Sequence, residues 1–379
     1  MFQFVPVRIH WTLLLFLGVV LLTALPYAAT QSGLVAGQFL LFGGLFLTVL
    51  AHEFAHAIVA RRFGAEVIEV LLTPLGGLTR MRRMPERPLH EGLVAFAGPA
   101  VNLVAAALIM IWAGPGPVIS QLGAVFGLPA AGQTQATIVV RDATDIVVII
   151  GSINLLLGGL NLFVPGFPMD SGRILRALLT PRLGHLRATL VAVGVGRTVG
   201  LIFLLFGLYL LLDSGMLLGG VLIIIALYLQ MMAAPEVQHA VARTVFERHA
   251  ARDGMQTDLP VIGPSTPVSE VQQVLASRQL RGMPVIDEHG RMVGWASLTL
   301  VMAESMQGSA ASPVRNLMTR YPWVMPGDGL WAVVRRMQDF QINPVPVVEP
   351  DGRFRGLITI ERLTKMLQED GPALLGRRA

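Results

Sequence analysis

Five consecutive residues within an apolar stretch carry the clearest chemistry in the sequence. His52, Glu53 and His56 form an HExxH pattern in LTVLAHEFAHAIVARRFG. On a helix, two histidines four residues apart lie on one face and can both direct an imidazole at one Zn²⁺. The glutamate beside them can take a proton from the attacking water. The chain has no cysteine, so thiolate ligands and disulfides are excluded, and the pattern predicts a hydrolase that holds one zinc ion per chain.

A catalytic zinc also needs a third protein ligand and an open position for water. Asp170 is the predicted third ligand, because it directly follows an apolar span in NLFVPGFPMDSGRIL. The prolines and glycines of this stretch let the backbone bend towards a site. Three other aspartates border spans on the opposite side and are interpreted as helix caps or helix-terminal charges; they are Asp142, Asp145 and Asp213.

Membrane-spanning helices are the elements that must position these residues. The 379 residues are 53% hydrophobic and 14% charged, and a span needs about 20 mostly apolar residues. Candidate spans lie at residues 11–30, 38–61, 91–113, 145–165, 191–212 and 216–234. The first is predicted to be a retained helix and not a cleaved signal peptide. A polar group inside a span is usually functional, although polar side chains at a helix end reaching the interface are the alternative interpretation of the HExxH pattern.

The arginines predict the orientation of these spans. Alternation of six spans places Arg8, residues 61–87 and residues 173–197 on one face, with twelve of the thirteen arginines that precede residue 240. Because arginine and lysine are enriched in cytosolic loops, both termini are predicted to be cytosolic in a multi-pass protein of the cell membrane. The arginines form no basic tract interleaved with aromatics, so no nucleic acid partner is expected. Lys365 is the only lysine among 29 basic residues, a bias typical of a GC-rich, prokaryotic genome.

Two regions do not fit the pattern of spanning helices. AEVIEVLLTPLGGLTRMRRM, residues 65–84, has β-branched alternation, a proline and a Gly-Gly pair, which predict short strands joined by turns. Such strands can offer an edge to which an unwound substrate adds, or form an amphipathic hairpin on the membrane surface. From residue 258, the sequence repeats a helix, strand, turn, strand, helix pattern, with turns at 287–290 and 350–352.

This repeat resembles a CBS (Bateman) pair. The predicted fold is therefore a polytopic α-helical membrane protein with about six transmembrane helices and a C-terminal α/β CBS pair. The predicted division is a membrane domain at 1–239, a linker at 240–257, tandem CBS domains at 258–370 and a tail at 371–379.

The motifs together resemble a known enzyme family. HEFAH, GPAVN at 98–102 and NLFVPGFPMDSGR at 161–173 resemble the site-2 protease family, intramembrane zinc metalloproteases of peptidase family M50. VRIHW and TPLGGLTRM are similar to its six-span branch with C-terminal CBS modules, so the resemblance covers essentially the whole chain. It implies regulated intramembrane proteolysis, in which a peptide bond of a membrane-anchored protein substrate is hydrolysed.

The resemblance also implies roles for individual residues. His52, His56 and Asp170 correspond to the zinc ligands, and Glu53 to the general base. Two asparagines, Asn102 and Asn161, correspond to polar groups that position the substrate or stabilise the tetrahedral oxyanion.

Two departures from the family pattern concern this site. Asn161 stands nine residues before Asp170 where the family has eight, and Ser171 replaces the first glycine after the aspartate. One added residue turns a helix by about 100°, so whether Asn161 faces the metal is open. Without the resemblance, Asn102 is interpreted as a polar residue of a span that bonds to neighbouring backbone.

The CBS pair leaves several partners open. In the CBS pattern, a serine or threonine after the last strand is followed three residues later by an aspartate that holds a ribose. Here Ser297 is followed by Leu300, and Thr359 by Arg362. Both repeats lack the carboxylate, so a homodimer through the CBS domains or substrate docking is weighed beside adenine nucleotide binding. The alternative for the whole chain is a CBS-regulated transporter or channel with an intramembrane His/Glu/Asp ion path, and a catalytically silent family member is a third.

Overall fold

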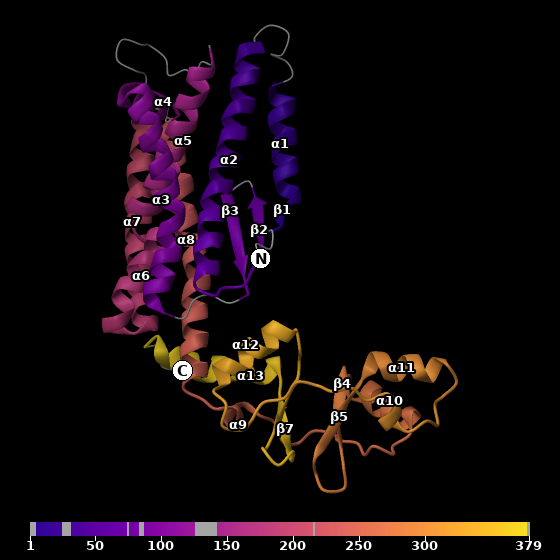
Figure 1. Ribbon diagram of the computed structural model, residues 1–379. Helices are drawn as coiled ribbons and strands as arrows, with labels where there is room; N and C mark the ends of the chain where they lie inside the picture. Colours follow the sequence, from indigo (N-terminus) through magenta and orange to yellow (C-terminus); the bar gives the residue numbers. More distant parts are fainter. Residues whose placement is uncertain are drawn as a thin grey trace. The chain divides into compact units, whose positions relative to one another are not determined.

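Helices cross a membrane because they satisfy their own backbone polar groups where no water can. Among the residues that the computed structural model describes, five helices are long and apolar enough to do so (Figure 1). They are α2 (Ser32–Arg62), α3 (Pro88–Ala113), α5 (Ala143–Phe163), α7 (His185–Ser214) and α8 (Leu217–Glu247). The structure describes residues 5–24, 32–73, 76–82, 87–125, 142–214 and 217–376.

These helices confirm five of the predicted spans. The predicted first span, 11–30, begins as the shorter apolar helix α1 (Trp11–Ala24), and its last residues lie outside the described part of the chain. Large apolar side chains on the helices face outward, with Ile111 81% exposed and Leu212 77% exposed. A bilayer covers apolar surface of this kind, and the chain is a multi-pass α-helical membrane protein.

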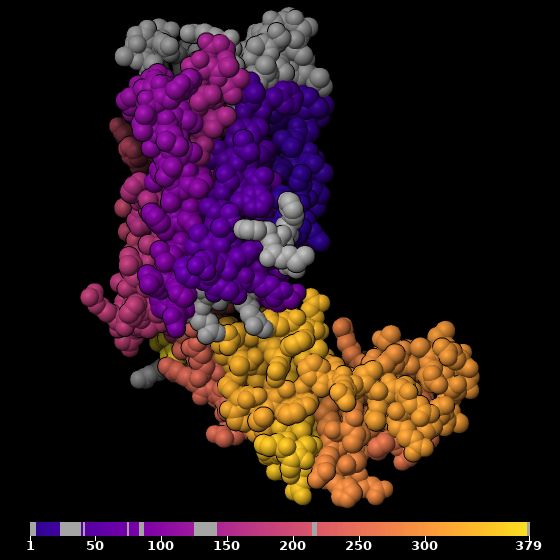
Figure 2. All heavy atoms as spheres, viewed as in Figure 1, coloured from indigo at the N-terminus to yellow at the C-terminus, as the bar shows by residue number. Residues whose placement is uncertain are grey.

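The chain divides into two compact units, Met1–Gln238 (unit 1) and His239–Ala379 (unit 2). Helix α8 belongs to both, because it runs without a break to Glu247. In the space-filling view of unit 1, the indigo atoms of α1 and α2 adjoin the purple atoms of α3 (Figure 2). Two shorter helices of unit 1 are α4 (Pro115–Val125) and α6 (Asp170–Leu183).

A small sheet in unit 1 confirms the strands predicted between the second and third spans. Strand β2 (Val67–Thr73) lies at its centre, with β1 (Val7–Ile9) parallel on one side and β3 (Gly76–Met81) antiparallel on the other. Val70 and Leu72 of β2 are buried in a cluster with Leu13 and Val49, so the central strand is anchored in the helical core. Strand β3 is therefore an edge strand that lies beside α2 (Figure 1).

Unit 2 contains the two predicted repeats. Each has a helix, a two-stranded antiparallel hairpin and a second helix, and the hairpin turns lie where the sequence predicts them. Residues 250 and 256 form isolated bridges with the second repeat. The elements are α9 (Ala251–Gly254), α10 (Val268–Ser277), β4 (Gly282–Ile286), β5 (Met292–Ser297), α11 (Leu298–Met306), η2 (Val314–Asn316), α12 (Leu330–Phe340), β6 (Val345–Val348), β7 (Phe354–Ile358) and α13 (Ile360–Leu374).

Candidate metal centre

Helix α2 presents the two histidines on one face, as their spacing predicts. His52 and His56 are buried, with 5% and 7% of their surface exposed. Their Nε2 atoms lie 3.0 Å apart, and the rings are nearly perpendicular at 84°. Two imidazole nitrogens this close, in an apolar interior, are suited to share one cation.

The third predicted ligand joins them from a segment 118 residues away. Asp170 is the first residue of α6, and its Oδ2 lies 3.1 Å from His52 Nε2 and 3.3 Å from His56 Nε2. The loop before α6 bends at Gly166, whose φ of +110° favours glycine. A Cβ there would lie 2.1 Å from the Cα of Gly196 in α7, so the glycine also lets this loop pack against α7.

The three donor atoms fit a zinc ion. For tetrahedral zinc with bonds of about 2.0–2.1 Å, neighbouring ligand atoms are about 3.3 Å apart. The three separations here are 3.0, 3.1 and 3.3 Å. Two imidazoles and one carboxylate also form a donor set that zinc prefers and that leaves a fourth position for water. His52, His56 and Asp170 are therefore the candidate metal site of this chain.

Electrostatics keep the Asp170 carboxylate ready for a metal. Burial by itself raises the pKa of this group, but hydrogen bonds from His52 and His56 outweigh that effect. The pKa of Asp170 consequently lies below its ordinary range. A ligating carboxylate must be ionised, and zinc would take the place of the imidazole protons that keep Asp170 ionised here.

Helix α3 supplies a partner for the far nitrogen of each ring. His56 Nδ1 donates to the carbonyl of Val94 at 2.7 Å. His52 Nδ1 lies 3.1 Å from Nδ2 of Asn102, a residue with no exposed surface. When Nε2 binds a metal, Nδ1 keeps the proton and must donate. The Asn102 amide then presents Oδ1 to His52, since its two ends are interchangeable in position. In this orientation Oδ1 accepts from His52, and Nδ2 takes the buried position at which the described residues offer no hydrogen-bond partner.

Gly98 allows α3 to approach the two rings. A Cβ at this position would lie 2.4 Å from His56 Nε2 and 2.6 Å from His52 Nε2. Real Cβ atoms do not come so close to other heavy atoms. The glycine of GPAVN is thus the point at which α3 packs closely against the two histidines.

Strand β3 contacts Glu53, the predicted general base on α2. The Thr79 hydroxyl lies 2.5 Å from Glu53 Oε2 and 3.1 Å from the Glu53 carbonyl oxygen. Gly77, two residues earlier on the same face of β3, lies so near that a Cβ would be 2.3 Å from Glu53 Cγ. Sequence reasoning missed Thr79, although its two-residue spacing from Gly77 in an edge strand is a visible signal.

The two predicted asparagines differ in their surroundings. Asn102 contacts a metal-site histidine, whereas Asn161 Nδ2 donates to the Leu157 carbonyl of its own helix at 3.0 Å. A third asparagine of the spans was missed. Asn154 is buried and donates to Thr48 Oγ1 of α2 at 2.9 Å, which joins α5 to the helix of the two histidines.

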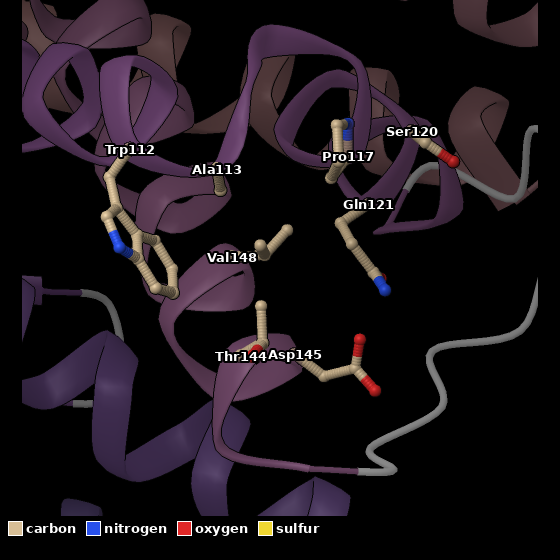
Figure 3. Close-up of a pocket in the computed structure, with 8 residues that line it drawn as sticks. All are labelled: Trp112, Ala113, Pro117, Ser120, Gln121, Thr144, Asp145 and Val148. Atoms are coloured by element: carbon tan, nitrogen blue, oxygen red, sulfur yellow. The ribbon is translucent and has the colours of Figure 1, made fainter.

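A separate cavity of about 480 Å³ lies between the end of α3, α4 and the start of α5 (Figure 3). In the close-up, Gln121 and Asp145 point towards each other across it. Trp112, which lines this cavity, follows Gly98 by fourteen residues, or about 21 Å of helix. The cavity is therefore remote from the metal centre.

A helical HExxH pattern and a distant aspartate that meet among apolar spans define an intramembrane zinc metalloprotease of the site-2 type. Comparison with known proteins agrees. The model of peptidase family M50 matches residues 40–207, and the CBS domain model matches residues 251–305 and 314–369. Zinc metalloprotease MJ0392 of Methanocaldococcus jannaschii is 28% identical over 355 residues, which cover 94% of this chain and 91% of that protein.

Among solved structures, a site-2 protease from Methanocaldococcus jannaschii is 31% identical. The match covers 62% of this chain and 94% of that one, with a TM-score of 0.41. The chain belongs to peptidase family M50, as a site-2 type zinc metalloprotease with a C-terminal pair of CBS domains. Membership in this family supports the interpretation of the chain as a protease over its interpretation as a transporter or channel.

Proposed function

We propose that the substrate is a membrane-anchored protein, and that one of its peptide bonds is hydrolysed within or at the bilayer in regulated intramembrane proteolysis. The observation that supports this is the meeting of His52, His56 and Asp170 next to Glu53, among apolar spans. These three residues would hold zinc, which supplies Lewis acidity to a scissile carbonyl and acidifies water.

In this proposal, Glu53 is the general base. It takes a proton from the attacking water and returns that proton to the leaving amine. The Thr79 hydroxyl binds one of its carboxylate oxygens, Oε2, and so restricts the rotation of the group. Asn102 steadies the ring of His52 or the oxyanion, and Asn161 is proposed to position the substrate.

The role of Glu53 as general base is tested by Glu53→Gln, which keeps the shape of the side chain and removes its basicity. Cleavage of a transmembrane substrate by purified protein should fall below detection, with zinc content per chain unchanged by metal analysis. His56→Ala and Asp170→Ala should lose zinc. Cleavage that persists in Glu53→Gln would overturn the role of Glu53.

The substrate is proposed to add as a strand to β3, the outer strand of the described sheet. Gly77 and Thr79 of this strand contact Glu53, so an extended segment paired with β3 passes beside the base. An extended backbone is needed because a helix shields its amides with internal hydrogen bonds and side chains.

For the rest of the chain, we propose cytosolic termini and a division near residue 239 into the protease and the CBS region. The CBS pair is proposed to regulate the protease, to dimerise or to dock substrate. Thr359 Oγ1 accepts a hydrogen bond from the Arg362 amide at the start of α13. The residue three positions after this hydroxyl is Arg362 and not a carboxylate, which supports dimerisation or docking over adenine nucleotide binding.

A further inference from the structure

A buried arginine links the helix that begins with Asp170 to two other helices. Arg176 of α6 is 4% exposed. Its Nε donates to Glu91 Oε1 at 2.9 Å, and Nη2 donates to the same oxygen. Its Nη1 donates to Glu236 Oε2 at 3.0 Å. The guanidinium thus uses three nitrogens on two carboxylates, which fixes its plane and its position.

The partners of Arg176 belong to the elements that build the metal centre. Glu91 lies in the first turn of α3, the helix that contacts both histidine rings. The guanidinium also lies over the Phe167 ring, with 4.7 Å between its Cζ and the ring centroid. Phe167 is fully buried in the loop that leads to Asp170. One side chain therefore fixes both the loop before the metal ligand and the helix after it.

The third connection reaches α8. Glu236 lies on α8, two residues before unit 1 ends at Gln238, and the helix continues to Glu247 in unit 2. Asp170 precedes Arg176 by six residues, about 9 Å of the same helix. A displacement of α8 at Glu236 would therefore pull on the helix that carries Asp170.

The desolvation cost of this ion cluster indicates that it has a role beyond packing. Taking a buried arginine and two partly buried carboxylates out of water is costly before they pair, and well-packed apolar residues are often at least as stabilising as a buried ion pair. What the cluster provides beyond packing is geometry, because a guanidinium fork accepts few arrangements of its partners.

We propose that Arg176 is a positioning residue of the protease. It holds Asp170 at metal-binding distance from His52 and His56, and through Glu236 it makes the metal centre responsive to α8. The inference rests on the proposed role of Asp170 as a ligand. It concerns placement of the carboxylate and not contact with substrate.

The test compares zinc affinity, measured by chelator competition, in full-length purified variants. Arg176→Met alone removes the arginine that pairs with Glu91 and the nearer of the two arginines beside Glu236, where Arg173 stays at 4.0 Å, and this can unfold the protein. A triple variant, Glu91→Gln with Arg176→Met and Glu236→Gln, removes all three charges together. Arg182→Gln, an exposed arginine at the end of α6, is the matched control.

We expect the triple variant to unfold at nearly the wild-type temperature but to bind zinc about 10- to 100-fold more weakly, the usual effect of losing an outer-shell support. Its kcat should fall with KM nearly unchanged, and Arg182→Gln should match wild type. Glu236→Gln alone should lower zinc affinity by a smaller factor.

Wild-type zinc affinity and kcat in the folded triple variant would overturn the proposal, and so would a triple variant that does not fold. The zinc content of Asp170→Ala, measured in parallel, separates the ligand role of Asp170 from the positioning role of Arg176. If that variant keeps its zinc, the proposed ligand set fails independently of Arg176.

Discussion

The orientation of the Asn102 amide leads to a prediction that separates two roles for this residue. If His52 binds zinc through Nε2, its Nδ1 donates to Asn102 Oδ1, across the 3.1 Å separation seen in the structure. Asn102→Ala then leaves the N–H of His52 without a partner, because Asn102 itself has no exposed surface through which bulk water could replace it. Asn102→Asp keeps an acceptor in the same place.

The magnitude follows from the buried donor. Leaving such a group unsatisfied costs about 1–3 kcal/mol, and each 1.4 kcal/mol is a factor of ten in affinity. Asn102→Ala should therefore bind zinc about 5- to 150-fold more weakly, in agreement with the 10–100-fold typical of outer-shell partners. The zinc affinity of Asn102→Asp should lie within about threefold of the wild-type affinity, since a carboxylate beside a zinc-bound histidine is a common arrangement.

The assay is chelator competition for zinc, followed by cleavage of a transmembrane substrate with zinc saturated. A role of Asn102 in stabilising the oxyanion requires an N–H donor, and predicts that both variants keep zinc and lose kcat. Wild-type zinc affinity in Asn102→Ala would refute the reasoning from the amide orientation.

Two further predictions use the close contacts of the site. Gly98→Ala should abolish zinc binding, because a methyl carbon 2.4 and 2.6 Å from the two Nε2 atoms must push the rings out of the geometry in which they share one ion. Metal analysis checks this beside Gly159→Ala, where a Cβ meets nothing within 4 Å. Zinc retained in Gly98→Ala would contradict the packing of α3 on the rings. Thr79→Val should lower kcat by about 10- to 100-fold with zinc content intact, since a hydrogen bond to a charged group contributes about 1.5–3 kcal/mol. Thr79→Ser keeps the donor and should retain most activity, and equal losses in both variants would count against the hydrogen bond.

The parts of the site that could be predicted are those set by local periodicity. His52 and His56 share a helix face because a helix repeats every 3.6 residues, whatever surrounds it. The strands at 67–73 and 76–81 were predictable from alternation, from the proline between them and from the Gly-Gly pair that begins the second. Asp170 could be named because its proline- and glycine-rich surroundings follow a span directly.

Contacts between distant segments could not be predicted in this way. Arg176 lies 85 residues from Glu91 and 60 from Glu236 in the sequence. Their pairing depends on how three helices rotate about their axes when they pack, which no single helix determines. Thr79 and Glu53 are separated by 26 residues and meet only because β3 lies against α2.

Helix α3 shows how one element can order most of the metal centre. Glu91 binds Arg176, the Val94 carbonyl binds His56, Gly98 gives both rings room and Asn102 contacts His52. The spacings of three, four and four residues keep all four on one face of the helix. Each is polar, small or acts through its backbone, so this face of α3 positions the metal centre. Because the four contacts lie on one helix, a rotation of α3 would disturb both histidines and the Arg176 contact of α6 together. A shared helix of this kind explains how ligands from segments far apart in sequence meet within 3.3 Å.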